Sequence, residues 1–308
     1  MKYYLKVFFI SLSIFTILLI CVAAIYIKNY SYVEEYNSNW ANEFVDNEDI
    51  SAEFISDIIE KNRINVLVVG LEEVRSDTTF VISYNAKLKN AHIISIPRDT
   101  YYFREDFQFS QNNKINSIYQ VKGIEGLKDK IEEILKIPIN NYIIIDYEAF
   151  KVAVDAVEGV EINVPFHMKY DDIKDSPPLR IDIKPGKQTL DGENALKFLR
   201  FRKGNPGYES YKHGDLERIK VHQNFIKELL KKVLGMDLIK VVKKVFPYIN
   251  TDFTIVQASS IAMNAIGIDI NDINFYTLPG ADRYENKISF YFYDEEEVSK
   301  LIKNIYMR

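Results

Sequence analysis

Three short apolar runs in the first third of the chain predict β-strands that lie side by side. The runs cover Val66–Val69, Thr78–Tyr84 and His92–Ile96, and each is rich in β-branched residues. The polar segment Asn85–Lys89 between the second and third runs is typical of a hairpin turn. If these strands are neighbours, the residues at their ends meet at one edge of a sheet.

Strand and helix patterns alternate further along the chain. Apolar residues at helical spacing predict an amphipathic helix over Ile124–Leu135, and Tyr142–Asp146 reads as a buried strand. Glu148–Val157 is apolar on nearly all sides and predicts a buried helix, and Val160–Val164 predicts another strand. This alternation favours a layered α/β fold.

The second half of the motif-bearing region contains turn residues and two further helices. Residues 165–189 are rich in proline, which predicts a long surface excursion. Asp191 can cap a helix over Gly192–Phe201, and Asp215 can cap a long amphipathic helix over Leu216–Leu234.

The N-terminus contains a candidate membrane anchor. Val7–Ile27 is 21 residues long and uncharged, and at 1.5 Å per residue it spans roughly 30 Å, the thickness of a bilayer core. Lys2 and Lys6 precede it and acids follow it, which predicts a cytoplasmic N-terminus and an extracellular body. Val22–Ala24 resembles a signal-peptide cleavage site, but the apolar run continues beyond it, so an uncleaved anchor is favoured.

The composition of the chain excludes some classes of protein but does not by itself indicate a function. The chain has 308 residues and a net charge of −5, so it lacks the bulk basic charge of a nucleic-acid-binding protein. Cys21 is the single cysteine, which excludes an intrachain disulfide. The polar segment after the anchor reads as a stalk, with a predicted helix over Ser51–Lys61 that Ser51 can cap.

Charged residues gather at the ends of the first three predicted strands. Glu72 follows the first, Arg75 and Asp77 enter the second, and Arg98 and Asp99 leave the third. Carboxylates hold hard cations through oxygen, and guanidinium groups bind phosphate through two parallel hydrogen bonds. Together these residues suit a metal–diphosphate substrate. Each of them taken alone is equally compatible with a solvated loop charge.

A second basic cluster lies between residues 190 and 223. Arg200 and Arg202 lie at the end of the first of the two later helices. Arg218 and His222 lie four residues apart on the second, so they share a face. A basic face at the start of a helix is suited to an anion, and this set would form a diphosphate clamp. The alternative is that Arg218 and His222 only solvate the helix.

These motifs, in this order, resemble the LytR-CpsA-Psr family of membrane-anchored cell-wall enzymes. Ser95–Thr100, with the sequence SIPRDT, is the most specific motif, and the chain end resembles the family's, with an acidic closing helix from Asp294. The matching motifs are Arg75–Thr78, Ser95–Thr100, Lys114–Asn116, Leu190–Leu196, Arg200–Lys203 and Gly214–Asp215 with Arg218.

The resemblance implies an α/β/α layered sandwich with a central mixed sheet and an apolar tunnel for a lipid. It implies an anchor within residues 1–28, a stalk over 29–61 and a catalytic domain over 62–308, with its motifs in about 64–232 and a C-terminal extension over 235–308. The implied reaction moves a glycopolymer from a polyprenyl-diphosphate carrier to peptidoglycan or a related acceptor. The product is a phosphodiester, and polyprenyl phosphate is released. The implied location is the cell membrane, with a single pass and an extracellular catalytic domain.

The resemblance also implies roles for individual residues. Mg²⁺, with Mn²⁺ as a substitute, is the implied cofactor, and the general base stays open between Asp77 and Glu72. Asp99 is expected to orient Arg98. The implied catalytic residues are Asp77, Arg98, Arg200 and Arg202. The implied metal ligands are Glu72 and Asp77. The implied diphosphate ligands are Arg75, Arg98, Lys114, Arg200, Arg202, Arg218 and His222.

Three positions depart from the family pattern. Glu72 stands where the family usually has aspartate, and Val221 and His222 stand where it usually has arginine and glutamine. These departures motivate an alternative, in which the protein binds polyprenyl-phosphate glycans without turnover. A membrane-linked regulator of nucleic acid is a third hypothesis, which the acidic charge and the predicted extracellular body disfavour.

Overall fold

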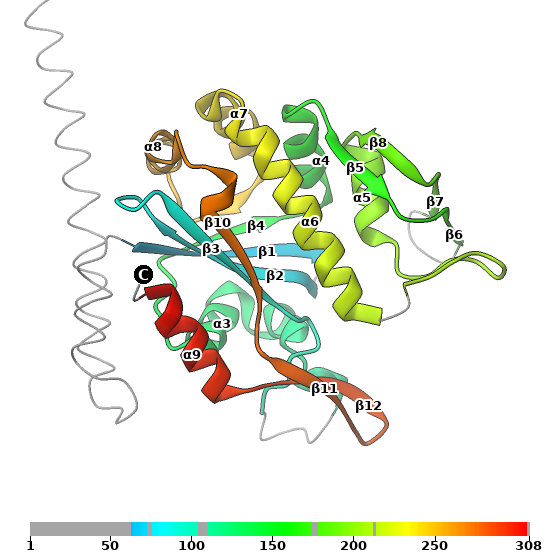
Figure 1. Cartoon of the computed structure of the whole chain (residues 1–308). Helices are drawn as coiled ribbons and strands as arrows, with labels where there is room; N and C mark the ends of the chain where they lie inside the picture. Colours follow the sequence, from blue (N-terminus) through cyan, green and yellow to red (C-terminus); the bar gives the residue numbers. More distant parts are fainter. Residues whose placement is uncertain (1–62, 73–74, 104–109, 174–177, 212–213, 307–308) are drawn as a thin grey trace, which may run out of the picture. The chain divides into compact units, whose positions relative to one another are not determined.

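A mixed β-sheet lies at the centre of the protein, for which we have a computed structural model (Figure 1). The structure describes residues 63–72, 75–103, 110–173, 178–211 and 214–306. Within them, the sheet has six strands, and β1 is antiparallel to β2 and parallel to β4. In sheet order the strands are β10 (Ile273–Thr277), β3 (Asn90–Ile96), β2 (Arg75–Asn85), β1 (Arg63–Glu72), β4 (Asn141–Ile145) and β9 (Asn250–Thr251).

The three apolar runs form β1, β2 and β3, and these strands are neighbours in the sheet, as predicted. Each strand extends beyond its apolar run because polar residues at its ends still pair with the adjacent strand. The predicted hairpin turn follows Asn85, whose side-chain oxygen accepts hydrogen bonds from the backbone of Lys87 at 3.0 Å and Leu88 at 2.9 Å. Asparagine favours turns by this local bond.

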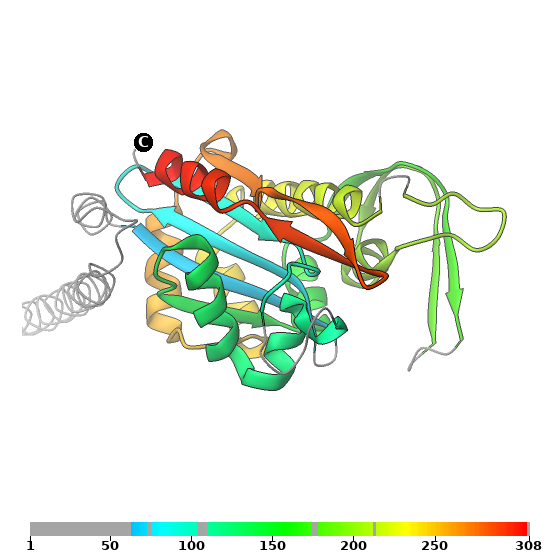
Figure 2. The same cartoon turned by 90° about the horizontal axis from the view of Figure 1, so that it is seen from below.

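Helices cover both faces of the sheet, so the predicted layered α/β/α arrangement is confirmed (Figures 1 and 2). Two helices lie on one face, α3 (Ile118–Leu135) and α9 (Glu295–Tyr306). The helices on the other face are α4 (Tyr147–Ala156), α6 (Gly214–Leu234), α7 (Leu238–Val245) and α8 (Ile255–Ala265). α3 begins six residues before the predicted helix and kinks at Gly123, where φ is 69°.

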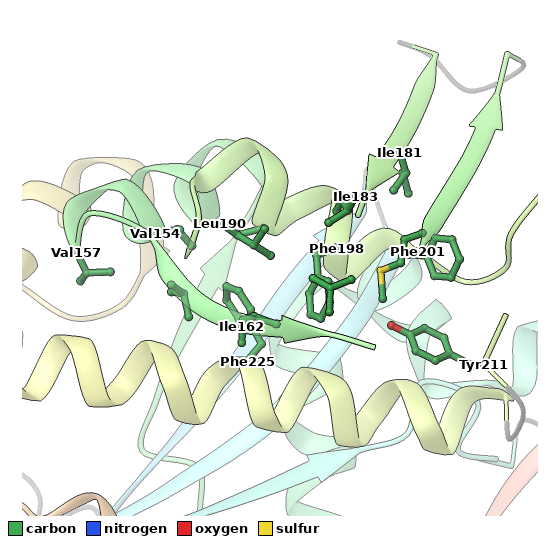
Figure 3. Close-up of a cluster of buried hydrophobic side chains, with 14 residues drawn as sticks. Val154, Val157, Ile162, Ile181, Ile183, Leu190, Phe198, Phe201, Tyr211 and Phe225 are labelled. Atoms are coloured by element: carbon green, nitrogen blue, oxygen red, sulfur yellow. The ribbon is translucent and has the colours of Figure 1, made fainter. Parts of the chain in front are cut away.

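The proline-rich segment is more regular than the predicted surface excursion. β5 (Val160–Val164) pairs with β8 (Gly186–Leu190), and β6 (Met168–Asp172) pairs with β7 (Leu179–Ile183), both antiparallel. Alternate residues of these strands are buried in a second apolar core, which Figure 3 shows around Phe198, Phe201 and Phe225. Successive side chains of a strand point to opposite faces, so every second residue of these segments can be buried against apolar neighbours. This burial explains why the segments form strands.

The two helices that carry the second basic cluster follow the prediction closely. α5 (Gly192–Arg200) is capped by Asp191, whose side chain accepts a hydrogen bond from the backbone of Asn194 at 2.9 Å. α6 begins at Gly214 rather than Leu216. Asp215 therefore lies in the first turn and not before it, a position where an acid is also favourable because of the helix dipole.

A C-terminal hairpin is attached to the end of β3. Its strands are β11 (Gly280–Glu285) and β12 (Ile288–Tyr293). The backbone of Tyr291 in β12 donates to Asp99 at 2.9 Å and accepts from Tyr101 at 2.8 Å. The acidic closing helix is α9, and the side chain of Asp294 accepts from the backbone of Glu297 at 3.0 Å. The extension thus supports the motif that follows β3.

The predicted anchor and stalk lie outside the residues that the structure describes. This applies to Val7–Ile27 and to the predicted helix Ser51–Lys61. Among the helices that are described, none is long and apolar enough to cross a membrane. The described residues all belong to one compact unit, Arg63–Arg308.

Candidate active site

The ends of β1, β2 and β3 meet at one edge of the sheet, as the sequence predicts. Gly70 lies opposite Thr78 and Leu71 lies opposite Ser76, so Asp77 is the extra residue of a β-bulge. Thr79, two residues on, pairs with the last residue of β3. Bulges change the direction of a strand and are common beside active sites. Asp77 therefore sits at a break in the pairing, next to the ends of both neighbouring strands.

The backbone around Arg98 forms a tight turn. The carbonyl of Pro97 accepts two hydrogen bonds from Thr100, one from its backbone N–H at 3.0 Å and one from its side-chain hydroxyl at 2.6 Å. The carbonyl of Arg98 accepts from the backbone of Asn116 at 3.2 Å. The turn thereby fixes the backbone that carries the Arg98 side chain.

Lys114 and Asp99 form a partly buried ion pair beside this turn. The Nζ of Lys114 lies 3.0 Å from Oδ1 of Asp99, and 5.7 Å from the ring centre of Phe290 in β12. Neither Lys114 nor Arg75 is among the residues that line the cavities described next, and Arg75 is exposed at the start of β2. Their predicted role as diphosphate ligands stays a prediction.

A cavity of about 340 Å³ lies between the sheet and helices α4, α5 and α6. Its walls are mainly aliphatic and aromatic, and its polar groups belong to a few residues near the sheet edge. The polar residues are Thr78, Asp146, Tyr147, Arg200, Arg202 and His222. The apolar residues include Val68, Phe80, Ile82, Ile93, Ile143, Phe150, Leu196, Phe225, Ile226, Leu229 and Leu230.

Arg200 ends α5 and stacks on an aromatic ring of α4. Its Cζ lies 4.8 Å from the ring centre of Tyr147. Asp146, the residue before Tyr147, caps α4 by accepting a hydrogen bond from the backbone of Ala149 at 2.8 Å. Stacking orients a guanidinium group without neutralising it. Arg202 is exposed beyond the helix end.

A smaller crevice of about 40 Å³ adjoins the main cavity and contains Arg98. Thr78, Phe80, His222 and Ile226 line both spaces, so the two are adjacent. Arg98 comes from the strand side and Arg200 from the helix side, with His222 bordering both spaces. The fold therefore brings these three residues to two adjacent spaces, and their role as diphosphate ligands stays a prediction.

Two neighbouring residues of α6 position that helix over the site. The Nε2 of His222 lies 3.1 Å from the carbonyl of Leu199 in α5. The side-chain amide of Gln223 donates to the hydroxyl of Ser95 at 3.1 Å and to the carbonyl of Tyr276 at 2.9 Å. α6 is thus tied to α5, β3 and β10 beside the arginines.

Sequence reasoning overlooked several of these residues. Asp146 is the last residue of a predicted strand and Tyr147 follows it, so the argument applied to the other strand ends would have found them. Gln223 gave no signal of its own. Val221 packs against the second apolar core, which explains how an apolar residue fits there.

The metal prediction rests on residues whose side chains are not described. For Glu72, Asp77 and Arg218 the structure gives the backbone alone. Among the described side chains, no group of three or more histidines, cysteines or acids could hold a metal ion. The backbone places Glu72 and Asp77 beside the cavity, since Gly70, Leu71 and Thr78 line it.

Comparison with known proteins identifies the family. The model of the LytR_cpsA_psr family matches residues 24–306. The chain belongs to the LytR_cpsA_psr family. The resemblance seen in the sequence motifs is therefore confirmed, and the C-terminal hairpin and α9 fall inside the family match.

Two proteins that are named as teichoic acid transferases are similar to this chain over most of its length. One is the polyisoprenyl-teichoic acid–peptidoglycan teichoic acid transferase TagV of Bacillus subtilis, which is 26% identical over 84% of this chain and 64% of its own length. The transferase TagU of Enterococcus faecalis is 28% identical over 78% of each chain. The crystal structure of B. subtilis TagV matches with a TM-score of 0.65 and 25% identity, over 79% of this chain and 97% of that one.

Proposed function

We propose that this protein is a phosphotransferase that attaches a glycopolymer to the cell envelope. The donor would be a glycan on a polyprenyl-diphosphate carrier, and the acceptor a hydroxyl of peptidoglycan or a related envelope polymer. The names of TagV and TagU as teichoic acid transferases support this proposal.

The observation that carries the proposal is an apolar cavity with arginines at its polar end. Arg200 and Arg202 border the space that Phe150, Leu196 and Leu229 line, and Arg98 lies in the adjoining crevice. A polyprenyl diphosphate has this composition, because a long apolar chain ends in two phosphates. The apolar walls would bind the isoprene units, and the arginines would bind the phosphates through paired charge-assisted hydrogen bonds.

The proposed reaction needs stabilisation of charge and alignment more than a covalent intermediate. The acceptor oxygen would attack the phosphorus that carries the glycan and form the new phosphodiester bond. The bond to the bridging oxygen would break, and polyprenyl phosphate would leave with the electron pair. Arg98, Arg200 and Arg202 would stabilise the negative charge that develops on the phosphate oxygens. A carboxylate, Asp77 or Glu72, would take the proton of the acceptor hydroxyl.

We propose Mg²⁺ as the cofactor, with Mn²⁺ as its substitute, because the backbone of Glu72 and Asp77 runs beside residues that line the cavity. When bound, the ion would neutralise part of the diphosphate charge. Glu72 and Asp77 would hold it, because carboxylate oxygens are the ligands that Mg²⁺ prefers. Arg218 would extend the diphosphate clamp from the first turns of α6.

The second candidate function is binding of the same lipid-linked glycan without turnover. Two observations favour it. Val221 packs in the apolar core where the family usually has arginine, and His222 contacts the carbonyl of Leu199. Fewer cationic groups at the diphosphate would bind the ground state but stabilise the transition state less.

A reconstituted transfer assay separates the two functions. The full chain would be incubated with a lipid-diphosphate oligosaccharide, peptidoglycan fragments and Mg²⁺. Formation of glycan-linked peptidoglycan together with polyprenyl phosphate supports the transferase. Saturable binding of the lipid-linked glycan with no product, under conditions where TagV is active, supports the binder instead.

We also propose that Val7–Ile27 anchors the protein in the cell membrane with a single pass and that the catalytic domain is extracellular. The support is the uncharged run of 21 residues and the lysines before it. Protease added to intact, wall-stripped cells should digest the domain. Protection of the domain, or its complete release into the medium, would contradict this topology.

A further inference from the structure

Two adjacent residues of α6, His222 and Gln223, contact two different elements of the candidate site. The Nε2 of His222 lies 3.1 Å from the carbonyl oxygen of Leu199, the residue before Arg200 in α5. The side-chain amide of Gln223 donates to Ser95, near the end of β3 and three residues before the arginine of the SIPRDT motif. Successive residues of an α-helix point about 100° apart. One short stretch of α6 therefore reaches both elements that carry arginines.

The contact of His222 completes the C-terminal end of α5. The last carbonyl groups of a helix have no backbone N–H of a following turn to bind, and Leu199 lies in the last turn of α5. A carbonyl oxygen only accepts hydrogen bonds, so Nε2 of His222 carries the hydrogen and donates it. Histidine side chains stabilise helix ends in this way. The bond therefore holds the end of α5 from which Arg200 reaches the ring of Tyr147.

Neutral His222 with its hydrogen on Nε2 is poorly suited to bind a diphosphate. Its Nδ1 is then an acceptor, and the oxygens of a diphosphate are acceptors as well. The donor of the imidazole meets the carbonyl of Leu199 at 3.1 Å. The geometry thus favours a contact of His222 with α5 over a contact with the substrate.

Gln223 holds β3 and β10 at the point where β3 enters the arginine turn. Its Nε2 lies 3.1 Å from the hydroxyl of Ser95, 2.9 Å from the carbonyl of Tyr276 and 3.2 Å from the hydroxyl of Thr277. Thr277 in β10 is the register partner of Ser95 in β3. The turn that follows β3 is closed by its own hydrogen bonds. The position of Ser95 therefore helps to determine the position of Arg98.

The same stretch of α6 is anchored in the second apolar core. Phe225 is completely buried there, and Val221 packs against the same core. His222 and Gln223 lie between these two residues in the sequence, and both border the crevice that contains Arg98. Residues 221–225 therefore form a fixed link between α5 and β3.

We propose that His222 and Gln223 are positioning residues that fix the separation of Arg200 and Arg98 and do not bind the diphosphate themselves. The inference rests on the proposed function, because it takes the diphosphate of the lipid carrier as the ligand of both arginines. Paired charge-assisted hydrogen bonds depend on the placement of the guanidinium groups. A displacement of about 1 Å that originates away from the reacting groups can cost about 100-fold in rate.

Two substitutions of His222 that differ by one methylene test the contact with α5. The amide nitrogen of glutamine reaches about as far from the backbone as Nε2 of histidine, whereas the amide nitrogen of asparagine stops near the place of Nδ1. His222→Gln should keep the affinity for geranyl diphosphate within about twofold, and His222→Asn should lower it about fivefold. Calorimetry on the full chain in detergent with Mg²⁺ measures this binding. Asn224→Leu, at an exposed position of α6, is the matched control and should bind as the parent does.

A double-variant cycle shows whether these residues act through the arginines. His222→Asn should cause no further loss of affinity in an Arg200→Gln background, and Gln223→Met should cause none in an Arg98→Gln background. In the exchanged combination, His222→Asn with Arg98→Gln, the loss should remain. Residues that bind the diphosphate directly would instead lower the affinity in every background.

The outcomes separate this inference from the proposed function. Melting curves show which variants are folded, and the leucine variant of the same position replaces any that is not. Folded variants that bind like the parent, or losses that persist when the matching arginine is absent, overturn the positioning role alone. If the parent does not bind geranyl diphosphate, the proposed diphosphate site and this inference are both wrong. Because binding is measured and not turnover, failure of the transfer assay would leave the positioning role intact.

Discussion

The Nζ of Lys114 lies 3.0 Å from Oδ1 of Asp99, inside the motif that leaves β3. Asp99 is also held through its backbone carbonyl by Tyr291 of the C-terminal hairpin, at 2.9 Å. The two contacts fasten the residue next to Arg98 from two directions. The pair therefore helps to hold the turn that carries Arg98 in place, and it also puts two charged groups beside the site.

We expect this pair to contribute to stability. Its side chains are 11% and 24% exposed, so removing Lys114 leaves a poorly solvated carboxylate. Lys114→Met should lower the free energy of unfolding by about 2 kcal/mol. Asp99→Asn and the double variant complete a thermodynamic cycle, measured by denaturant unfolding. A coupling energy near zero would show that the pair does not stabilise the fold.

The arginines should be sensitive to replacement by lysine, which keeps the charge but loses the forked geometry. Arg98→Lys or Arg200→Lys should reduce the transfer rate about tenfold or more, since ~1.4 kcal/mol in the barrier is one decade. Arg180→Lys, at an exposed position of β7, is the matched control and should change neither the rate nor the melting temperature. The melting temperature is measured with the rate. If Arg98→Lys unfolds the protein while its folded fraction works normally, Arg98 is structural.

A larger side chain in the cavity should lower the affinity for a long lipid carrier more than the affinity for a short one. Leu229→Trp places an indole among the apolar walls, and excluding even two methylenes of the lipid costs ~1.6 kcal/mol, about tenfold in affinity. We expect this loss for a long polyprenyl diphosphate and little loss for a short one. Leu229→Met conserves the volume and serves as control. Equal losses for both carriers would place the lipid elsewhere.

Glu72 at the end of β1 and Asp77 in the bulge of β2 should respond differently to substitution. Asp77→Asn should abolish turnover and weaken metal binding, which the spectroscopic signal of Mn²⁺ measures independently of activity. Glu72→Asp should be tolerated, because it restores the shorter ligand that is usual in the family. Full activity of Asp77→Asn in the presence of a chelator would exclude this metal site.

Glu132 should make stability depend on pH. Burial raises the pKa of its carboxyl group, although the carboxylate accepts a hydrogen bond from the backbone of Ile139 at 2.7 Å, which lowers it. A pKa raised by folding favours the folded state below the unfolded pKa, and this advantage is lost as pH rises through the folded pKa.

Glu132→Gln keeps the acceptor oxygen and removes the charge. Its melting temperature should therefore exceed that of the parent at about pH 7.5 and approach it at about pH 4. The neighbouring Glu133→Gln, at a more exposed position, is the control. A Glu132→Gln variant that is less stable than the parent at the higher pH would mean that the ionised group stabilises the fold.

Much of the fold could be predicted from the sequence because its signals are local. Period-two and β-branched runs identified β1, β2 and β3, and Asp191 identified the start of α5. The strands of residues 165–189 were missed, since proline there reads as a break, and burial of Ile181 and Ile183 by distant residues decided the outcome. The intrinsic β-propensity of a segment is a weak guide to its structure where tertiary packing supplies most of the stabilising free energy.

The sequence by itself determined the chemistry of the site, and the tertiary structure decided its partners. The motif Ser95–Thr100, together with Arg200 and Arg202, predicted a phosphate-binding site, because carboxylates and guanidinium groups gathered in this way suit a metal–diphosphate substrate. The pairing of Lys114 with Asp99, the ring of Tyr147 beneath Arg200 and the apolar cavity required the packed fold. Each depends on side chains from separate elements, whose distances are set by packing of the helices on the sheet and by no local pattern.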